Sequence, residues 1–102
     1  MSVANDATHN KVFISFQNNE EARPIIESIL EDNPGAVVSE MPAMIKIDVP
    51  YLLVVRRSTI EEKIGRNFDL QSMHINLISL AGNIEESEDE FILAWGPSGH
   101  SA

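Results

Sequence analysis

The sequence predicts an α+β domain in which two to three helices pack on an antiparallel or mixed β-sheet. Three observations support this. A chain of 102 residues with 43% hydrophobic content suits one core. Several short segments alternate apolar and polar residues, as strands do, and one longer segment repeats its apolar residues at helical spacing. We expect the order β-α-β-β-β-α-β-β over residues 11–95, between flexible tails at 1–10 and 96–102.

The first strand is predicted at Lys11–Gln17, where every second residue is apolar. A helix follows over about Asn19–Asp32. Asn18 or Asn19 is expected to cap its start, and Pro24 is expected in its first turn, where a missing N–H does least harm. The apolar residues at helical spacing are Ala22, Ile25, Ile26, Ile29 and Leu30.

A short meander is predicted after this helix, because two prolines separate three strand-like segments. The segments are Ala36–Glu40, Met44–Val49 and Tyr51–Arg57. A second, short helix is expected next. Ser58 and Thr59, each followed by a glutamate three residues later, predict a capping box at its start, and Gly65 is expected to end it.

The C-terminal part is predicted to hold two more strands, at His74–Leu80 and Phe91–Trp95. Asp69 can cap a further turn before the first of them. The acidic run Glu85–Glu90 is expected to be a solvated connection. Trp95 is expected to close the core, with a role at an interface as the alternative.

Composition excludes several classes of protein. There are 16 acidic and 7 basic residues, a net charge of -9, so a nucleic-acid partner is not expected. No cysteine is present, which excludes disulfides and cysteine-ligated metals. The apolar runs are too short to span a membrane, and the first ten residues do not resemble a secretory signal. We therefore expect a cytoplasmic location.

No residue set for catalysis or cofactor binding is recognisable. His9, His74 and His100 lie far apart, and the acidic run lacks the ligand pattern of a calcium loop. Asp48 and Glu40 are scattered carboxylates, which solvated surface explains better than acid–base catalysis. The sequence therefore predicts a protein that is not an enzyme by itself, with no metal and no cofactor.

One ordered string of residues is distinctive: Gly65-Arg66-Asn67-Phe68-Asp69, followed by Ile75-Asn76-Leu77-Ile78-Ser79-Leu80-Ala81-Gly82. With Met41-Pro42-Ala43-Met44 before it, this string resembles the effector proteins, also called coupling or regulatory proteins, of bacterial multicomponent diiron monooxygenases of the phenol hydroxylase type. The resemblance spans about residues 11–95. It implies a cofactorless protein that binds the diiron hydroxylase component and tunes its active site, so that NADH oxidation stays coupled to hydroxylation of an aromatic substrate.

The resemblance also implies which residues meet the hydroxylase, namely Asn76, Ile78, Ser79 and Leu80. Outward apolar residues here, beside Ala81 and Gly82, would form a flat patch that a partner could cover. The other interpretation buries Ile78 and Leu80 in the core. Met41 and Met44 either fill gaps in the core or offer an adaptable contact to the partner.

Two further expectations accompany this hypothesis. The free protein is expected to be a monomer. The competing function is a small ligand-sensing domain, in which an apolar pocket between the first helix and the sheet would take a metabolite.

Overall fold

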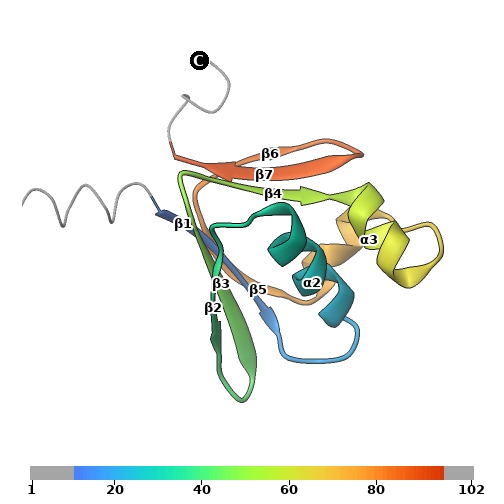
Figure 1. The fold of residues 1–102 in the computed structure, drawn as a ribbon, viewed down its shortest axis with the longest axis horizontal. Helices are drawn as coiled ribbons and strands as arrows, with labels where there is room; N and C mark the ends of the chain where they lie inside the picture. Colours follow the sequence, from blue (N-terminus) through green and yellow to red (C-terminus); the bar gives the residue numbers. More distant parts are fainter. Residues whose placement is uncertain (1–10, 96–102) are drawn as a thin grey trace, which may run out of the picture.

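The computed structural model describes residues 11–95, which form seven strands, two α-helices and one 3-10 helix (Figure 1). The α+β class is as predicted from the sequence. The elements are β1 (Lys11–Gln17), α2 (Arg23–Asp32), β2 (Val37–Glu40), β3 (Met44–Pro50), β4 (Leu52–Arg56), α3 (Arg57–Ile64), the 3-10 helix η1 (Leu70–Ile75), β5 (Leu77–Ala81), β6 (Asn83–Glu86) and β7 (Glu90–Ala94).

The strands form two separate sheets in which every pairing is antiparallel. Sheet A has the order β2-β3-β1-β5, and sheet B has the order β4-β7-β6. The chain crosses between the sheets at Tyr51, whose φ of 70° is left-handed, and at Gly82, whose φ is 137°. In Figure 1 the two sheets lie at a steep angle, and α2 and α3 fill the space that this angle opens.

The core lies where the two sheets and the helices meet. Val12, Ile14 and Phe16 of β1 are fully buried, which places one face of sheet A inward as the alternation predicts. Sheet B contributes its own fully buried residues, Leu53, Val55, Phe91 and Leu93, and the helices contribute Ile25, Ile29 and Ile60. Burying an aliphatic side chain of this size stabilises a fold by about 1.5–3 kcal/mol, so these residues carry much of the stability.

Helix α2 ends at a buried asparagine that also completes sheet B. The side-chain nitrogen of Asn33 donates to the carbonyls of Ile29 and Val54, both at 2.7 Å, and its oxygen accepts from the Val54 N–H at 2.9 Å. Strand β4 lies at the edge of sheet B, so Val54 has no strand partner on that side. The Asn33 amide therefore takes the place of a neighbouring strand and joins α2 to β4.

Several boundaries differ from the sequence prediction. Helix α2 begins at Arg23 and not near Asn19, although Pro24 does lie in its first turn and Asn19 Oδ1 accepts from the Ala22 N–H at 2.9 Å. The capping box at Ser58 and Thr59 was wrong, because α3 begins at Arg57 and its N-cap, Arg56, makes no side-chain cap. Gly65 does end α3, with a left-handed φ of 74°.

The C-terminal half holds the larger differences. Residues 74 and 75 belong to η1 and not to a strand, so β5 begins at Leu77, and Asp69 caps η1 by accepting from the Gln71 N–H at 3.1 Å. The acidic run is not only a connection, because Glu85 and Glu86 lie in β6. Trp95 does not close the core: its side chain is 44% exposed and donates to the Lys11 carbonyl at 2.6 Å.

The expected tails at 1–10 and 96–102, with His9 and His100, lie outside the described residues. Within residues 11–95, no helix is long and apolar enough to cross a membrane.

Candidate functional site

Strand β5 presents the candidate site and is an edge strand of sheet A. Its register on β1 shifts once: Ser79 lies opposite Ser15, but Leu77 lies opposite Phe16, so Ile78 is an extra residue at a bulge. A bulge re-aims side chains, and Ile78 is 47% exposed. Leu77 and Leu80 instead pack against the core. The sequence did not decide whether Ile78 and Leu80 face outward or into the core. The structure places Ile78 outward and Leu80 inward.

A pair of serine hydroxyls holds the bulge in place. Ser15 lies on the outward face of β1 by alternation, yet its side chain is fully buried. Its hydroxyl oxygen lies 2.8 Å from the hydroxyl oxygen of Ser79 and 3.3 Å from the Ser79 carbonyl. These contacts fix β5 on β1 beside Ile78, because a buried hydroxyl without a partner is unfavourable.

Asn76 anchors the start of β5 and is only 4% exposed. Its carbonyl accepts from the Gln17 N–H at 2.8 Å, and its side-chain oxygen accepts from Asn19 Nδ2 at 2.9 Å. Its side-chain nitrogen donates to Glu21 at 3.3 Å. Asn76 therefore joins β1, the turn before α2 and β5, so it supports the neighbouring surface from beneath and adds little exposed area to it.

Gly82, another candidate from the sequence, lies between β5 and β6, and the remaining candidates lie on two parts of sheet A. Ser79 is exposed and Ala81 is half-buried; they lie opposite Ser15 and Phe13, on the outward face. Met41 is exposed in the β2–β3 turn and Met44 is half-buried at the start of β3. Neither methionine belongs to the buried core cluster. Met44 and β5 lie on opposite sides of β1, so the candidates span the outward face without forming one compact cluster.

Sequence reasoning missed three residues between these groups. Phe13, Lys46 and Asp48 lie on the outward face, with the Lys46 ammonium 4.4 Å from the centre of the Phe13 ring and 3.8 Å from Asp48. The cation over the ring and its carboxylate partner order this part of the face. The only indication of these residues in the sequence was the alternation of β1 and β3, which predicts that all three lie on the same face of the sheet.

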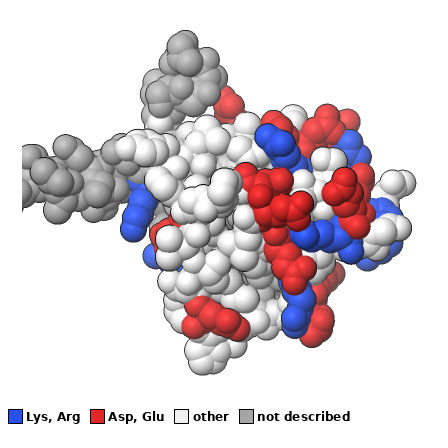
Figure 2. Space-filling view, viewed as in Figure 1, with Lys and Arg blue, Asp and Glu red and all other residues white. Residues whose placement is uncertain are grey.

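Charged residues are distributed unevenly over the molecule. Figure 2 shows acidic and basic groups crowded over the helices, whereas the surface over the sheets is largely uncharged in this view. Ion pairs hold the charged region together. The hydrogen bond to Asp89 and the charge of Glu61 raise the pKa of Arg57, and the hydrogen bond to Glu31 raises the pKa of Lys63, so both side chains stay cationic. The centre of a protein-docking surface is typically depleted of charged residues, so the crowded charges over the helices are less suited to that role.

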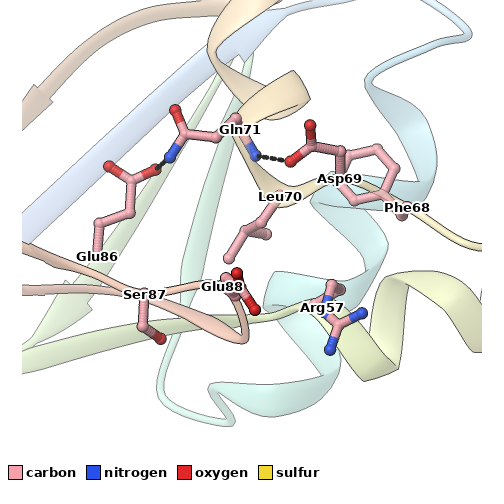
Figure 3. Close-up of a pocket in the computed structure, with 8 residues that line it drawn as sticks. All are labelled: Arg57, Phe68, Asp69, Leu70, Gln71, Glu86, Ser87 and Glu88. Atoms are coloured by element: carbon pink, nitrogen blue, oxygen red, sulfur yellow. Dashed lines mark hydrogen bonds between the residues drawn. The ribbon is translucent and has the colours of Figure 1, made fainter.

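One hollow among the described residues is lined by several charged and polar side chains. It has a volume of about 400 Å³ and lies between η1 and the β6–β7 turn (Figure 3). Its one cation, Arg57, is already bound by Asp89 and Glu61, and Gln71 Nε2 donates to Glu86 at 2.7 Å across the rim. In the described part of the chain, no three histidine or acidic side chains are grouped so as to hold a metal ion. The hollow therefore offers a mixed polar surface without a catalytic arrangement.

Gly82 allows β5 to pass from sheet A into sheet B, and we expect Gly82→Ala to lower the free energy of unfolding by about 1–3 kcal/mol. A Cβ here would lie 3.1 Å from Val12 Cγ1 on a backbone with φ 137°. Urea unfolding measures the change. Gly35→Ala is the matched control, because its Cβ would meet Pro50 Cδ at 3.5 Å and Pro50 Cγ at 3.6 Å, which are ordinary contacts. Equal effects of the two substitutions would contradict this role for Gly82.

Comparison with known proteins places this geometry in a family. Residues 10–94 match the MmoB/DmpM family. The chain is 46% identical over 84 residues to the phenol 2-monooxygenase stimulatory component DmpM of Pseudomonas sp. (strain CF600), covering 82% of this chain and 93% of that protein.

Two solved structures are also similar to this chain. A chain in the structure of a phenol hydroxylase–regulatory protein complex shares 50% identity, with a TM-score of 0.81 over 84% of this chain and 99% of that one. The soluble methane monooxygenase regulatory protein B shares the fold at 21% identity, with a TM-score of 0.68 over 89% of this chain and 69% of that one. Together, the match over nearly the whole described region and the identity to DmpM show that this chain belongs to the MmoB/DmpM family.

Proposed function

We propose that this protein is the regulatory component of a multicomponent phenol or related aromatic monooxygenase, acting in the cytoplasm. It binds the diiron hydroxylase component and keeps NADH oxidation coupled to hydroxylation, without contributing a reactive group of its own. The observation that carries the proposal is the 50% identity over 99% of a chain in the phenol hydroxylase–regulatory protein complex.

The surface proposed to meet the hydroxylase is the outward face of sheet A together with the β5 bulge. Ile78 and Met41 supply exposed apolar area, and Ser79 supplies a polar group beside them. Buried Asn76 and Ser15 hold this strand in a fixed shape. A preformed surface loses little conformational entropy on binding, which favours affinity.

Regulation of this kind needs only a difference in affinity. If the protein binds one conformation of the hydroxylase better than another by about 1–3 kcal/mol, the population of that conformation rises several-fold. By reciprocity, the redox or substrate state of the hydroxylase changes its affinity for the regulator.

The test is a titration of this protein into purified hydroxylase and reductase, with product and NADH measured together. We expect product formed per NADH consumed to rise and then level off as the hydroxylase is saturated. The same titration with heat-denatured protein is the control. A ratio that stays constant across the whole titration would contradict the proposal.

The ligand-sensing alternative gains no support from the interior. Residues of α2 and the sheets that would line such a pocket, including Ile25, Ile29 and Leu53, have at most 2% of their surface exposed. A cavity wide enough for a water molecule would leave accessible area on its lining. The space between the helix and the sheets is therefore filled by side chains.

A further inference from the structure

The distinctive segment Gly65–Asp69 has a shape that the fold specifies closely. Gly65 takes a left-handed conformation, and its N–H donates to the Glu61 carbonyl at 2.8 Å. The Glu61 carboxylate accepts from the Phe68 N–H at 2.9 Å and also pairs with Arg57 at 3.3 Å. These bonds turn the chain from the end of α3 toward η1, so the segment forms one wall of a groove.

This groove, which we name the η1 groove, has a volume of about 310 Å³ and lies between the start of α2, the end of α3 and η1. Its floor includes the half-buried side chains of Pro24, Ile64 and Phe68. Ile75 also lines it and is 67% exposed. The groove therefore has apolar area that the fold itself does not cover.

Three carboxylates also line the groove. Glu20, Glu21 and Asp69 line the groove against one guanidinium, that of Arg66, so its rim is net negative. Glu20 is held by Arg23 at 3.0 Å but its side chain is 89% exposed, and Glu21 contacts Asn76 at 3.3 Å. An apolar floor with an acidic rim fits a lysine or arginine side chain, because its methylene stem is apolar and its head is cationic.

The groove lies close in sequence to the β5 bulge, because Ile75 lines the groove and precedes Ile78 by three residues. Ile75 and Ile78 are both exposed and lie on either side of Asn76, which is buried and joined to Glu21. Asn76 at the start of β5 contacts Glu21, which lines the groove, so the start of this strand lies against the groove. We propose that the η1 groove is a second contact, which receives a lysine or arginine side chain of the hydroxylase component; this inference rests on the function proposed above.

The charge of the occupant is tested with Glu20→Lys, and Glu88→Lys is its control. Both substitutions change the net charge equally, but Glu88 lies at the β6–β7 turn and does not line the groove. We expect Glu20→Lys to raise the Kd for the purified hydroxylase about five- to tenfold at low salt, and Glu88→Lys to change it less than twofold. Because salt screens exposed charges, the Glu20→Lys defect should shrink as ionic strength rises. A defect that salt does not reduce would overturn the cationic occupant.

The apolar floor is tested with Ile75→Ser against Ile84→Ser, since both isoleucines are exposed and Ile84 lies on β6, outside the groove. Ile75→Ser is expected to raise the Kd at least threefold, and Ile84→Ser to leave it unchanged. Thermal unfolding of each variant checks that the fold is retained. If Glu20→Lys and Ile75→Ser both bind like the original protein while Ile78→Glu is impaired, the groove is not a contact but the proposed function stands. If the original protein fails to bind, the proposed function itself fails.

Discussion

Replacing Asn33 by alanine is expected to lower the free energy of unfolding by about 3 kcal/mol, a large fraction of the stability of a domain of this size. The substitution removes three hydrogen bonds, to the Ile29 carbonyl and to both backbone groups of Val54. Asn33 is buried, so these groups lose their partner without gaining full access to water, and each unsatisfied group costs about 1–3 kcal/mol. Urea unfolding followed by circular dichroism gives the change directly.

Two further variants separate hydrogen bonding from shape. Asn33→Asp keeps an oxygen that accepts from the Val54 N–H but loses both hydrogen bonds that the amide nitrogen donates. This variant should therefore also have a lower free energy of unfolding. Asn83→Ala, at an exposed position on β6, should change the free energy of unfolding by less than about 0.5 kcal/mol. If Asn33→Ala unfolds at the same urea concentration as the original protein, Asn33 does not support β4.

Replacing Ile78 by glutamate is expected to raise the concentration needed for half-maximal stimulation of the hydroxylase at least tenfold. A carboxylate placed at a covered apolar contact loses its hydration, and about 1.4 kcal/mol of lost binding free energy corresponds to each tenfold change in affinity. The fold should tolerate the change, because 47% of the Ile78 surface is already exposed. Product formation at increasing concentrations of the variant, with the hydroxylase held constant, measures the effect.

The structure offers a closely matched control for this substitution. Ile84 is also 47% exposed but lies on β6 in sheet B. Ile84→Glu should stimulate the hydroxylase as the original protein does. A large drop in the melting temperature of Ile78→Glu alone would assign Ile78 to the core, and equal loss of stimulation in both variants would show that the β5 bulge is not a specific contact.

Local sequence patterns correctly predicted those elements whose conformation is determined by residues within the element itself. Alternation placed β1 at Lys11–Gln17 with the bounds that the structure has. The fixed φ of proline put Pro24 in the first turn of α2, and the freedom of glycine put Gly65 at the end of α3. The resemblance to diiron monooxygenase effectors was likewise carried by residues in order along the chain, and family membership confirms it.

The wrong predictions concern residues whose conformation depends on hydrogen-bond partners that are distant in the sequence. Glu85 and Glu86 look like a solvated loop, but β7 supplies their backbone hydrogen bonds, and an edge strand can turn charged side chains to water. Trp95 looks like core, yet the Lys11 carbonyl holds its indole at the surface. The end of the first helix after Asp32 was predicted, but nothing in the sequence indicated that Asn33 binds Val54, which is 21 residues away.

By itself, the sequence determined the helical and strand periods, the absence of cysteine chemistry and the family. Only the tertiary structure decided that Asn76 and Leu80 turn inward while Ile75 and Ile78 remain exposed. The reason is physical: a period of two specifies which residues share a face, but a bulge or a shared hydrogen bond shifts that register, and both depend on the neighbouring strand.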